Sequence, residues 1–175
     1  TRLYTLSLHD ALPISDALGR WFRDAADSGS LVRYLEGFAH TVGVMASEDA
    51  LFRVASECAQ DLAADGVVYA EVRYAPELWL DADLPMPAVV EAVNAGFRAG
   101  ERAAADAGHS IRVGALLCAM RQNERAMEVA DLVVRYRDAG VAGFDIAGPE
   151  DGFSPMRQAE AFEYLRRENA RYTIH

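Results

Sequence analysis

The sequence predicts an α/β fold with parallel strands, and three observations support this class. Helical and strand-like hydrophobic periodicities alternate along the chain, most connecting stretches are short, and a single helix separates each strand from the next. An open doubly wound sheet and part of a (β/α)8 barrel both produce this alternation. No G-x-G-x-x-G run follows a predicted strand, which disfavours the dinucleotide-binding form of the open sheet.

We predict helices where apolar residues recur three and four positions apart. They cover residues 16–30, 31–38, 48–64, 88–107, 124–139 and 155–169. Start and stop signals flank several of them. Ser47 is a suitable N-cap for the third helix, and Gly140 ends the fifth.

Strands are predicted at residues 67–74, 111–118 and 141–147, and residues 171–175 begin a fourth. Glu71 and Arg73 share one face of the first strand, and we expect them to form an internal salt bridge.

Polar residues follow the carboxyl ends of these strands. They are Arg73, Arg121, Asp145 with Gly148, and His175. Barrel enzymes place their active sites at this face, so we favour a partial (β/α)8 TIM barrel over the open sheet. Four strands are about half of such a barrel, so we expect a partial barrel that is truncated at both ends.

The stretch Val141–Glu150 is the most informative one. Asp145 lies within an apolar run, where a charge is costly unless it is paired. Gly148 leaves a backbone N–H open to close approach, and Pro149 fixes the following turn. A βα turn with a satisfied core aspartate and a functional strand end explain this pattern equally well.

Composition restricts the possible partners. The net charge of −10 argues against nucleic acid and acidic membranes and favours a small-molecule substrate. No run reaches transmembrane length, and no secretion signal is evident. Cys58 and Cys118 are interpreted as reduced, buried thiols of a cytoplasmic protein.

The first fifteen residues differ in character from the rest. Residues 1–15 resemble translated sequencing-adapter DNA, and we expect them to be a non-native artefact that precedes a partial barrel domain at 16–175. His9 and Asp10 therefore make a poor candidate metal or acid–base pair. The chain also begins at Thr1 and stops at His175 within a strand-like run, so we expect an internal fragment.

Four motifs in order resemble bacterial adenosine deaminases. They are Val-Val-Tyr-Ala-Glu-Val-Arg-Tyr-Ala-Pro, Cys-Ala-Met-Arg, Gly-Phe-Asp-Ile-Ala-Gly-x-Glu and a terminal Tyr-Thr-Ile-His. The resemblance implies a zinc-dependent (β/α)8 barrel that hydrolyses adenosine and 2′-deoxyadenosine to inosine and ammonia. Zinc lowers the pKa of its bound water to about 7, which supplies hydroxide at neutral pH.

The resemblance also assigns roles to particular residues. His175 is implied as the third zinc-ligating histidine, and Gly148 as a backbone donor to the purine. Asp145 and Ala147 are implied to shape the strand end. The implied apolar pocket consists of Leu31, Tyr34, Leu35, Phe38 and Met120. Judged on the residues alone, the pocket residues are more typical of core packing, and His175 is only a terminal histidine.

Two departures from the family limit the expected activity. The His-x-His of the first barrel strand is absent, and so is the Ala-Gly-Glu expected after His175. We therefore predict that this chain lacks the catalytic acid, does not bind catalytic zinc and is inactive. Two alternatives remain, namely a fragment of a related adenine or nucleotide deaminase, and a non-catalytic α/β binding module that closes on a second chain. The oligomeric state is not predicted.

Overall fold

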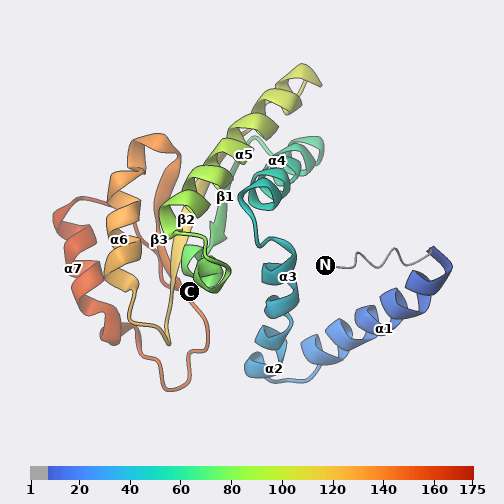
Figure 1. The fold of residues 1–175 in the computed structure, drawn as a ribbon. Coiled ribbons are helices and arrows are strands. Elements are labelled where there is room, and N and C mark those ends of the chain that lie inside the picture. Colours follow the sequence, from blue (N-terminus) through green and yellow to red (C-terminus); the bar gives the residue numbers. More distant parts are fainter. Residues whose placement is uncertain (1–7) are drawn as a thin grey trace. The chain divides into compact units, whose positions relative to one another are not determined.

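The structure is a computed structural model that describes the backbone of residues 8–175 and the side chains of residues 16–175. Two compact units make up the chain, Thr1–Thr41 and Val42–His175 (Figure 1). The side chains of His9 and Asp10 lie outside the described residues. None of the described helices is both long enough and apolar enough to cross a bilayer.

The first unit is helical. It contains α1 (Leu8–Ala26) and α2 (Leu31–Glu36), and α3 (Phe38–Val44) leads into the second unit. The hydroxyl of Ser30 caps α2 by accepting a hydrogen bond from the Arg33 N–H at 3.4 Å. The helix predicted over 31–38 is instead two helices, because α2 ends at Glu36 with Gly37 as its C-cap and α3 begins at Phe38. A Cβ at this glycine would lie 3.0 Å from the Phe22 ring.

The second unit contains a three-stranded parallel sheet, which confirms the predicted α/β class. Its strands are β1 (Tyr69–Tyr74), β2 (Arg112–Met120) and β3 (Val141–Ala147), in the order β1-β2-β3. Parallel neighbours need crossover connections, and α5 (Met86–Asp106) and α6 (Ala126–Arg135) supply them (Figure 1).

The second unit also contains short 3₁₀ helices that were not predicted. Short 3₁₀ helices occur at Pro76–Ala82 (η1), Arg137–Ala139 (η2) and Pro155–Gln158 (η3). The last precedes α7 (Ala159–Arg167), so the helix predicted from 155 begins as a 3₁₀ turn. The Ser154 hydroxyl accepts a hydrogen bond from the Met156 N–H at 3.3 Å, which suits this tight start.

Helix α4 (Glu48–Ala64) begins at the predicted N-cap and packs against α5. The Ser47 hydroxyl accepts a hydrogen bond from the Ala50 N–H at 3.2 Å. On this helix Val54 is exposed, whereas Ala55 and Ala59 are buried. These small residues allow α4 to approach the glycines of α5 closely.

The core lies on one face of the sheet. On β2 this face carries Val113, Ala115, Leu117 and Ala119, which are buried with residues of α5 and α6. Since side chains alternate along a strand, Gly114, Leu116, Cys118 and Met120 lie on the opposite face.

The fourth predicted strand is present as one parallel bridge beside β3. Phe144 donates its N–H to the Arg171 carbonyl at 3.0 Å and accepts from the Thr173 N–H at 2.9 Å. A ladder needs several consecutive pairs, and Phe144 and Tyr172 form a single one. The prediction of a strand over 171–175 was therefore too long, although its position and direction were correct.

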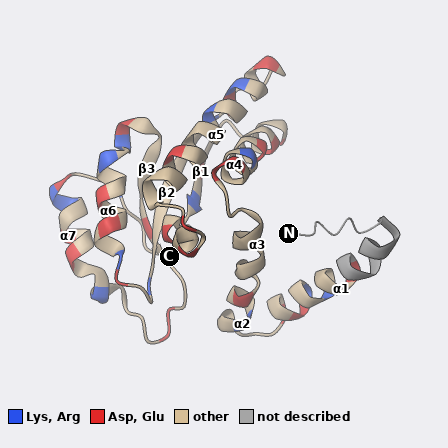
Figure 2. Ribbon diagram, in the orientation of Figure 1, with Lys and Arg blue, Asp and Glu red and all other residues tan. Residues whose placement is uncertain are grey.

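Charged side chains are interspersed along the helices of the second unit. Figure 2 shows basic and acidic residues along α4, α5, α6 and α7. Three of the ion pairs join residues one turn apart on the same helix or at its cap. Such exposed pairs contribute little to stability, so the fold depends chiefly on the core.

Candidate functional site

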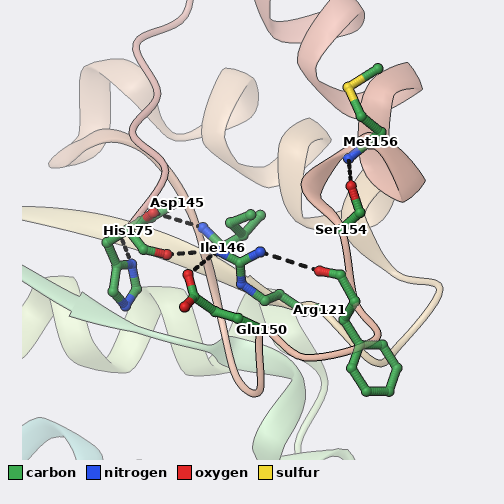
Figure 3. Close-up of polar contacts among 8 residues, drawn as sticks. Arg121, Asp145, Ile146, Glu150, Ser154, Met156 and His175 are labelled. Carbon is green, nitrogen blue, oxygen red and sulfur yellow. Dashed lines mark hydrogen bonds and ion pairs between the residues drawn. The ribbon is translucent and has the colours of Figure 1, made fainter.

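Polar side chains from successive strand ends meet at the carboxyl edge of the sheet. Asp145 on β3 lies between Arg73 of β1 and His175 of the C-terminal segment. Its Oδ2 is 3.4 Å from Arg73 Nε and 2.8 Å from His175 Nδ1. The convergence expected for parallel strands is thus present, and Figure 3 shows the His175 ring beside Asp145.

The carboxylate of Asp145 is fully buried and has a hydrogen-bond or charge partner at each oxygen. Oδ1 accepts the N–H of Ile146 at 2.8 Å, while Oδ2 faces the two side chains described above. A buried carboxylate needs such partners to remain in the interior. Asp145 therefore satisfies a structural requirement and also orients the groups around it.

The predicted salt bridge between Glu71 and Arg73 is wrong. Arg73 pairs with Asp145, and Glu71 accepts a hydrogen bond from the Tyr69 hydroxyl at 2.6 Å. The reason is tertiary, because the sheet places the buried Asp145 carboxylate within reach of Arg73. A nearby cation stabilises a buried carboxylate such as that of Asp145 more than an exposed carboxylate such as that of Glu71.

His175 is half-exposed and is oriented by its neighbours. Its Nδ1 faces Asp145, so Nε2 is the ring nitrogen left for another partner. A carboxylate at one imidazole nitrogen is the usual support for a histidine that binds a metal through the other. The geometry of this single residue fits a metal ligand.

Arg121 joins the loop after β3 to His175. The guanidinium donates to the Phe153 carbonyl at 3.3 Å and to the His175 carbonyl at 2.6 Å. One of its nitrogens also lies 3.5 Å from Glu150 Oε1. Figure 3 marks this ion pair with a dashed line. In the described part of the chain its Nε has no hydrogen-bond partner. Arg121 thus links the backbone of the loop after β3, at Phe153, to the backbone of His175.

Gly148, Met120 and Ala147 lie together at the same edge. Met120 is the register partner of Ala147 across β2 and β3. Gly148 has φ +100°, and a Cβ there would lie 3.3 Å from Met120 Cε and 2.5 Å from Gln122 Oε1. The three residues are half-buried. The structure therefore groups the predicted purine-facing residues of the second unit.

The remaining predicted pocket residues belong to the first unit. Leu31, Tyr34 and Phe38 are exposed and Leu35 is half-buried. The rings of Tyr34 and Phe38 pack edge-to-face at 5.5 Å, and both line a small apolar cavity of about 180 Å³. Their role toward a purine stays a prediction.

Sequence reasoning missed a buried polar group beside Met120. Glu77, Asn123 and Gln158 contact Met120 or one another, and two of them are buried. The signal was present in the sequence. Glu77 directly follows Pro76 at the end of the first strand, between apolar residues, where an unpaired carboxylate would be costly.

Two groups near the site are held protonated. Burial raises the pKa of the Cys118 thiol to about 12, and the nearby Asp145 carboxylate adds to the effect while Arg73 opposes it. Burial also raises the pKa of Tyr74, with a smaller contribution from Cys118. A protonated thiol neither attacks substrates nor ligates metals well, so Cys118 is not a nucleophile here.

A second cavity, larger than the one beside Tyr34, lies at the other end of the strands. It has a volume of about 490 Å³ and is lined by residues at the amino ends of β2 and β3. Its charged residues are largely engaged, since Arg112 pairs with Glu101 at 3.0 Å and Arg98 donates to the Ala139 carbonyl. We therefore assign the site to the carboxyl edge.

Comparisons with known proteins agree on one family. The family model described as adenosine deaminase matches residues 5–175. Adenosine deaminase 1 of Streptomyces coelicolor is 67% identical over 166 residues, which are 94% of this chain and 42% of that protein.

Solved structures share the fold at lower identity. An N6-mAMP deaminase from Arabidopsis superposes with a TM-score of 0.79 at 24% identity, covering 95% of this chain and 50% of that chain. An amidohydrolase from Burkholderia ambifaria, solved with bound Zn, gives a TM-score of 0.64 at 20% identity over 91% of this chain and 47% of that chain. The chain thus spans about half the length of the proteins it matches.

Proposed function

This chain belongs to the adenosine deaminase family, and on that premise we propose that the protein it represents hydrolyses adenosine to inosine and ammonia. The same site would accept 2′-deoxyadenosine. The observation that carries the proposal is the meeting of Asp145, His175 and Gly148 at the carboxyl edge of a parallel sheet. In (β/α)8 enzymes this edge holds the active site.

The described residues have distinct proposed roles. The N–H of Gly148 would donate to a purine ring nitrogen, and Met120 would contact the purine from the neighbouring strand. On the family resemblance alone, Leu31, Tyr34, Leu35 and Phe38 are proposed as apolar substrate contacts. Asp145 would hold the His175 ring, and Ala147 would leave room for the base.

Zinc would be held through Nε2 of His175, and it would supply an activated water for attack at C6 of the purine. The bound Zn of the Burkholderia amidohydrolase supports this metal for the whole protein. Within residues 16–175, however, no three His, Cys, Asp or Glu side chains form a cluster that could hold a metal. One ligand does not retain zinc, since catalytic sites use about three.

We propose accordingly that the 175-residue chain is inactive and represents strands 2–5 of a barrel. The set of elements and the coverage of about half of each relative support this placement. Residues 1–15 are proposed to be non-native. The two free cysteines suit the proposed cytoplasmic location.

A segment exchange tests the function directly. Residues 16–175 would replace the corresponding segment of the Streptomyces coelicolor relative, and adenosine loss would be followed by ultraviolet absorbance. We expect zinc-dependent activity from the chimera and none from the chain alone. The His175→Ala chimera should lose bound zinc as well as activity. An inactive chimera that folds and binds zinc would contradict the proposal.

A related adenine or nucleotide deaminase is the second candidate. The Arabidopsis relative acts on a nucleotide according to its name, but its identity of 24% supports the fold alone. The 67% identity to an adenosine deaminase favours the nucleoside. Comparing adenosine, adenine and AMP as substrates of the chimera separates these possibilities. A chimera that binds no zinc and deaminates none of the three compounds would favour a binding module.

A further inference from the structure

Glu77 is a buried carboxylate whose partners are not cations. Only 6% of its surface is exposed. Its Oε1 accepts the backbone N–H of Met120 at 2.6 Å, and its Oε2 accepts the Asn123 side-chain amide at 2.7 Å. Burying a charge in this way is costly unless each oxygen is satisfied, which the two contacts achieve.

The end of β1 explains why Met120 needs this partner. The last register pair between β1 and β2 joins Tyr74 to Leu117, and η1 then leaves the sheet at Pro76. Met120 lies beyond that last pair, so its N–H has no strand neighbour on the β1 side. The Glu77 carboxylate takes the place of the absent strand carbonyl.

The backbone carbonyl of Met120 is held by hydrogen bonds as well. The Met120 carbonyl accepts the Gln158 side-chain amide at 3.2 Å and the Asn123 backbone N–H at 3.1 Å. Asn123 therefore closes a turn onto Met120 and also binds Glu77. These contacts fix the backbone from which the Met120 side chain reaches toward Gly148.

We propose that Glu77 is a positioning residue that sets how far Met120 projects against Gly148, and hence the depth of the purine-facing surface. This inference rests on the proposed function for its consequence, because Met120 and Gly148 are the proposed purine contacts. The contacts that carry it are independent of that assignment. Glu77 contacts Met120 and Asn123, and its proposed effect on the purine-facing surface acts through Met120.

Hydrogen exchange and methyl NMR on the 175-residue chain test the proposal. The Glu77→Gln variant keeps the shape of the side chain but replaces the carboxylate with a neutral amide, so the Met120 N–H donates to an uncharged and therefore weaker acceptor. We expect the Met120 amide to exchange roughly tenfold faster or more. The nuclear Overhauser contact between the Met120 methyl and Gly148 should weaken in parallel.

Two further variants separate positioning from general destabilisation. Asn123 is an exposed loop residue, and Asn123→Ala removes its amide, which is one of the two partners of Glu77. This variant should increase the exchange rate of the Met120 amide by a smaller factor. Glu124→Gln removes an equal charge from the exposed neighbouring position and should leave Met120 unchanged. Unaltered exchange and an unaltered Met120–Gly148 contact in Glu77→Gln and Asn123→Ala would overturn the proposal.

Addition of adenosine provides a separate readout. If adenosine shifts the Met120 methyl resonance, half-saturation should require more adenosine in Glu77→Gln than in the unchanged chain, because the backbone that carries Met120 is then held less firmly. Failure of the proposed function has a different signature. Adenosine would then leave the Met120 methyl of the unchanged chain unmoved, while the exchange effect of Glu77→Gln would persist and support the positioning role.

Discussion

Replacing Gly148 by alanine tests whether this residue contacts the purine. Gly148 has φ +100°, and an added Cβ would lie 2.5 Å from Gln122 Oε1 and 3.3 Å from Met120 Cε. Gly152, in the same loop, provides a matched control. Its φ is +78°, and a Cβ there would meet nothing within 4 Å.

The two substitutions share one cost and differ in another. Both place alanine in a left-handed conformation, which costs about 1–3 kcal/mol of folding stability. Only Gly148→Ala also displaces Met120 and Gln122. Because the contacted atoms are the ends of flexible side chains, the additional loss of stability should stay below about 1 kcal/mol.

The effect on activity should separate the variants far more widely. A misplacement of about 1 Å at a reacting centre can reduce the rate roughly a hundredfold. In the chimera with the Streptomyces coelicolor relative, we therefore expect Gly148→Ala to lower kcat/KM by on the order of a hundredfold. Gly152→Ala should stay within about threefold. Equal activities at matched stability would refute the purine-contact role of Gly148.

Three further predictions concern stability. In α5, a Cβ on Gly96 would lie 2.3 Å from a backbone carbonyl of α4, so Gly96→Ala should cost about 1–3 kcal/mol in urea unfolding. Gly43→Ala, in open space on α3, should gain up to about 1 kcal/mol, and equal effects would contradict the packing argument. Asp145→Asn should destabilise by about 1–3 kcal/mol, less than a fully buried pair would, because Arg73 is half-exposed. An unchanged unfolding midpoint would show that this carboxylate contributes no net stability. The Cys118 thiol has its pKa raised to about 12, so it keeps its proton in the folded chain while the unfolded chain loses it above about 9. Stability should therefore fall between pH 9 and 12, and this fall should be shallower in Cys118→Ala than in the unchanged chain.

Most elements were predictable from the sequence because their signals are local. The strand over Val141–Ala147 matches its prediction, and α4 begins one residue after Ser47 as expected. The polar group at each strand end was also predictable. Parallel strands bring their carboxyl ends to one edge, whatever the details of packing.

Errors arose where distant parts of the chain decide the outcome. The sequence spacing of Glu71 and Arg73 favoured a local pair, whereas the sheet supplied a buried partner from β3. The buried face of α4 likewise depends on a distant neighbour, because the glycines of α5 select small residues for close contact. Periodicity identifies an apolar stripe but does not tell which neighbour will cover it.

The sequence by itself determined the α/β class, the family and the residues that gather at the carboxyl edge of the sheet. Periodicity, turn residues and motifs are properties of short stretches, and they persist without the rest of the molecule. The tertiary structure alone decided the orientation of His175 by Asp145 and the hold of Glu77 on Met120. These contacts join residues that are far apart in the chain, and a buried charge selects its partner only after the strands have paired.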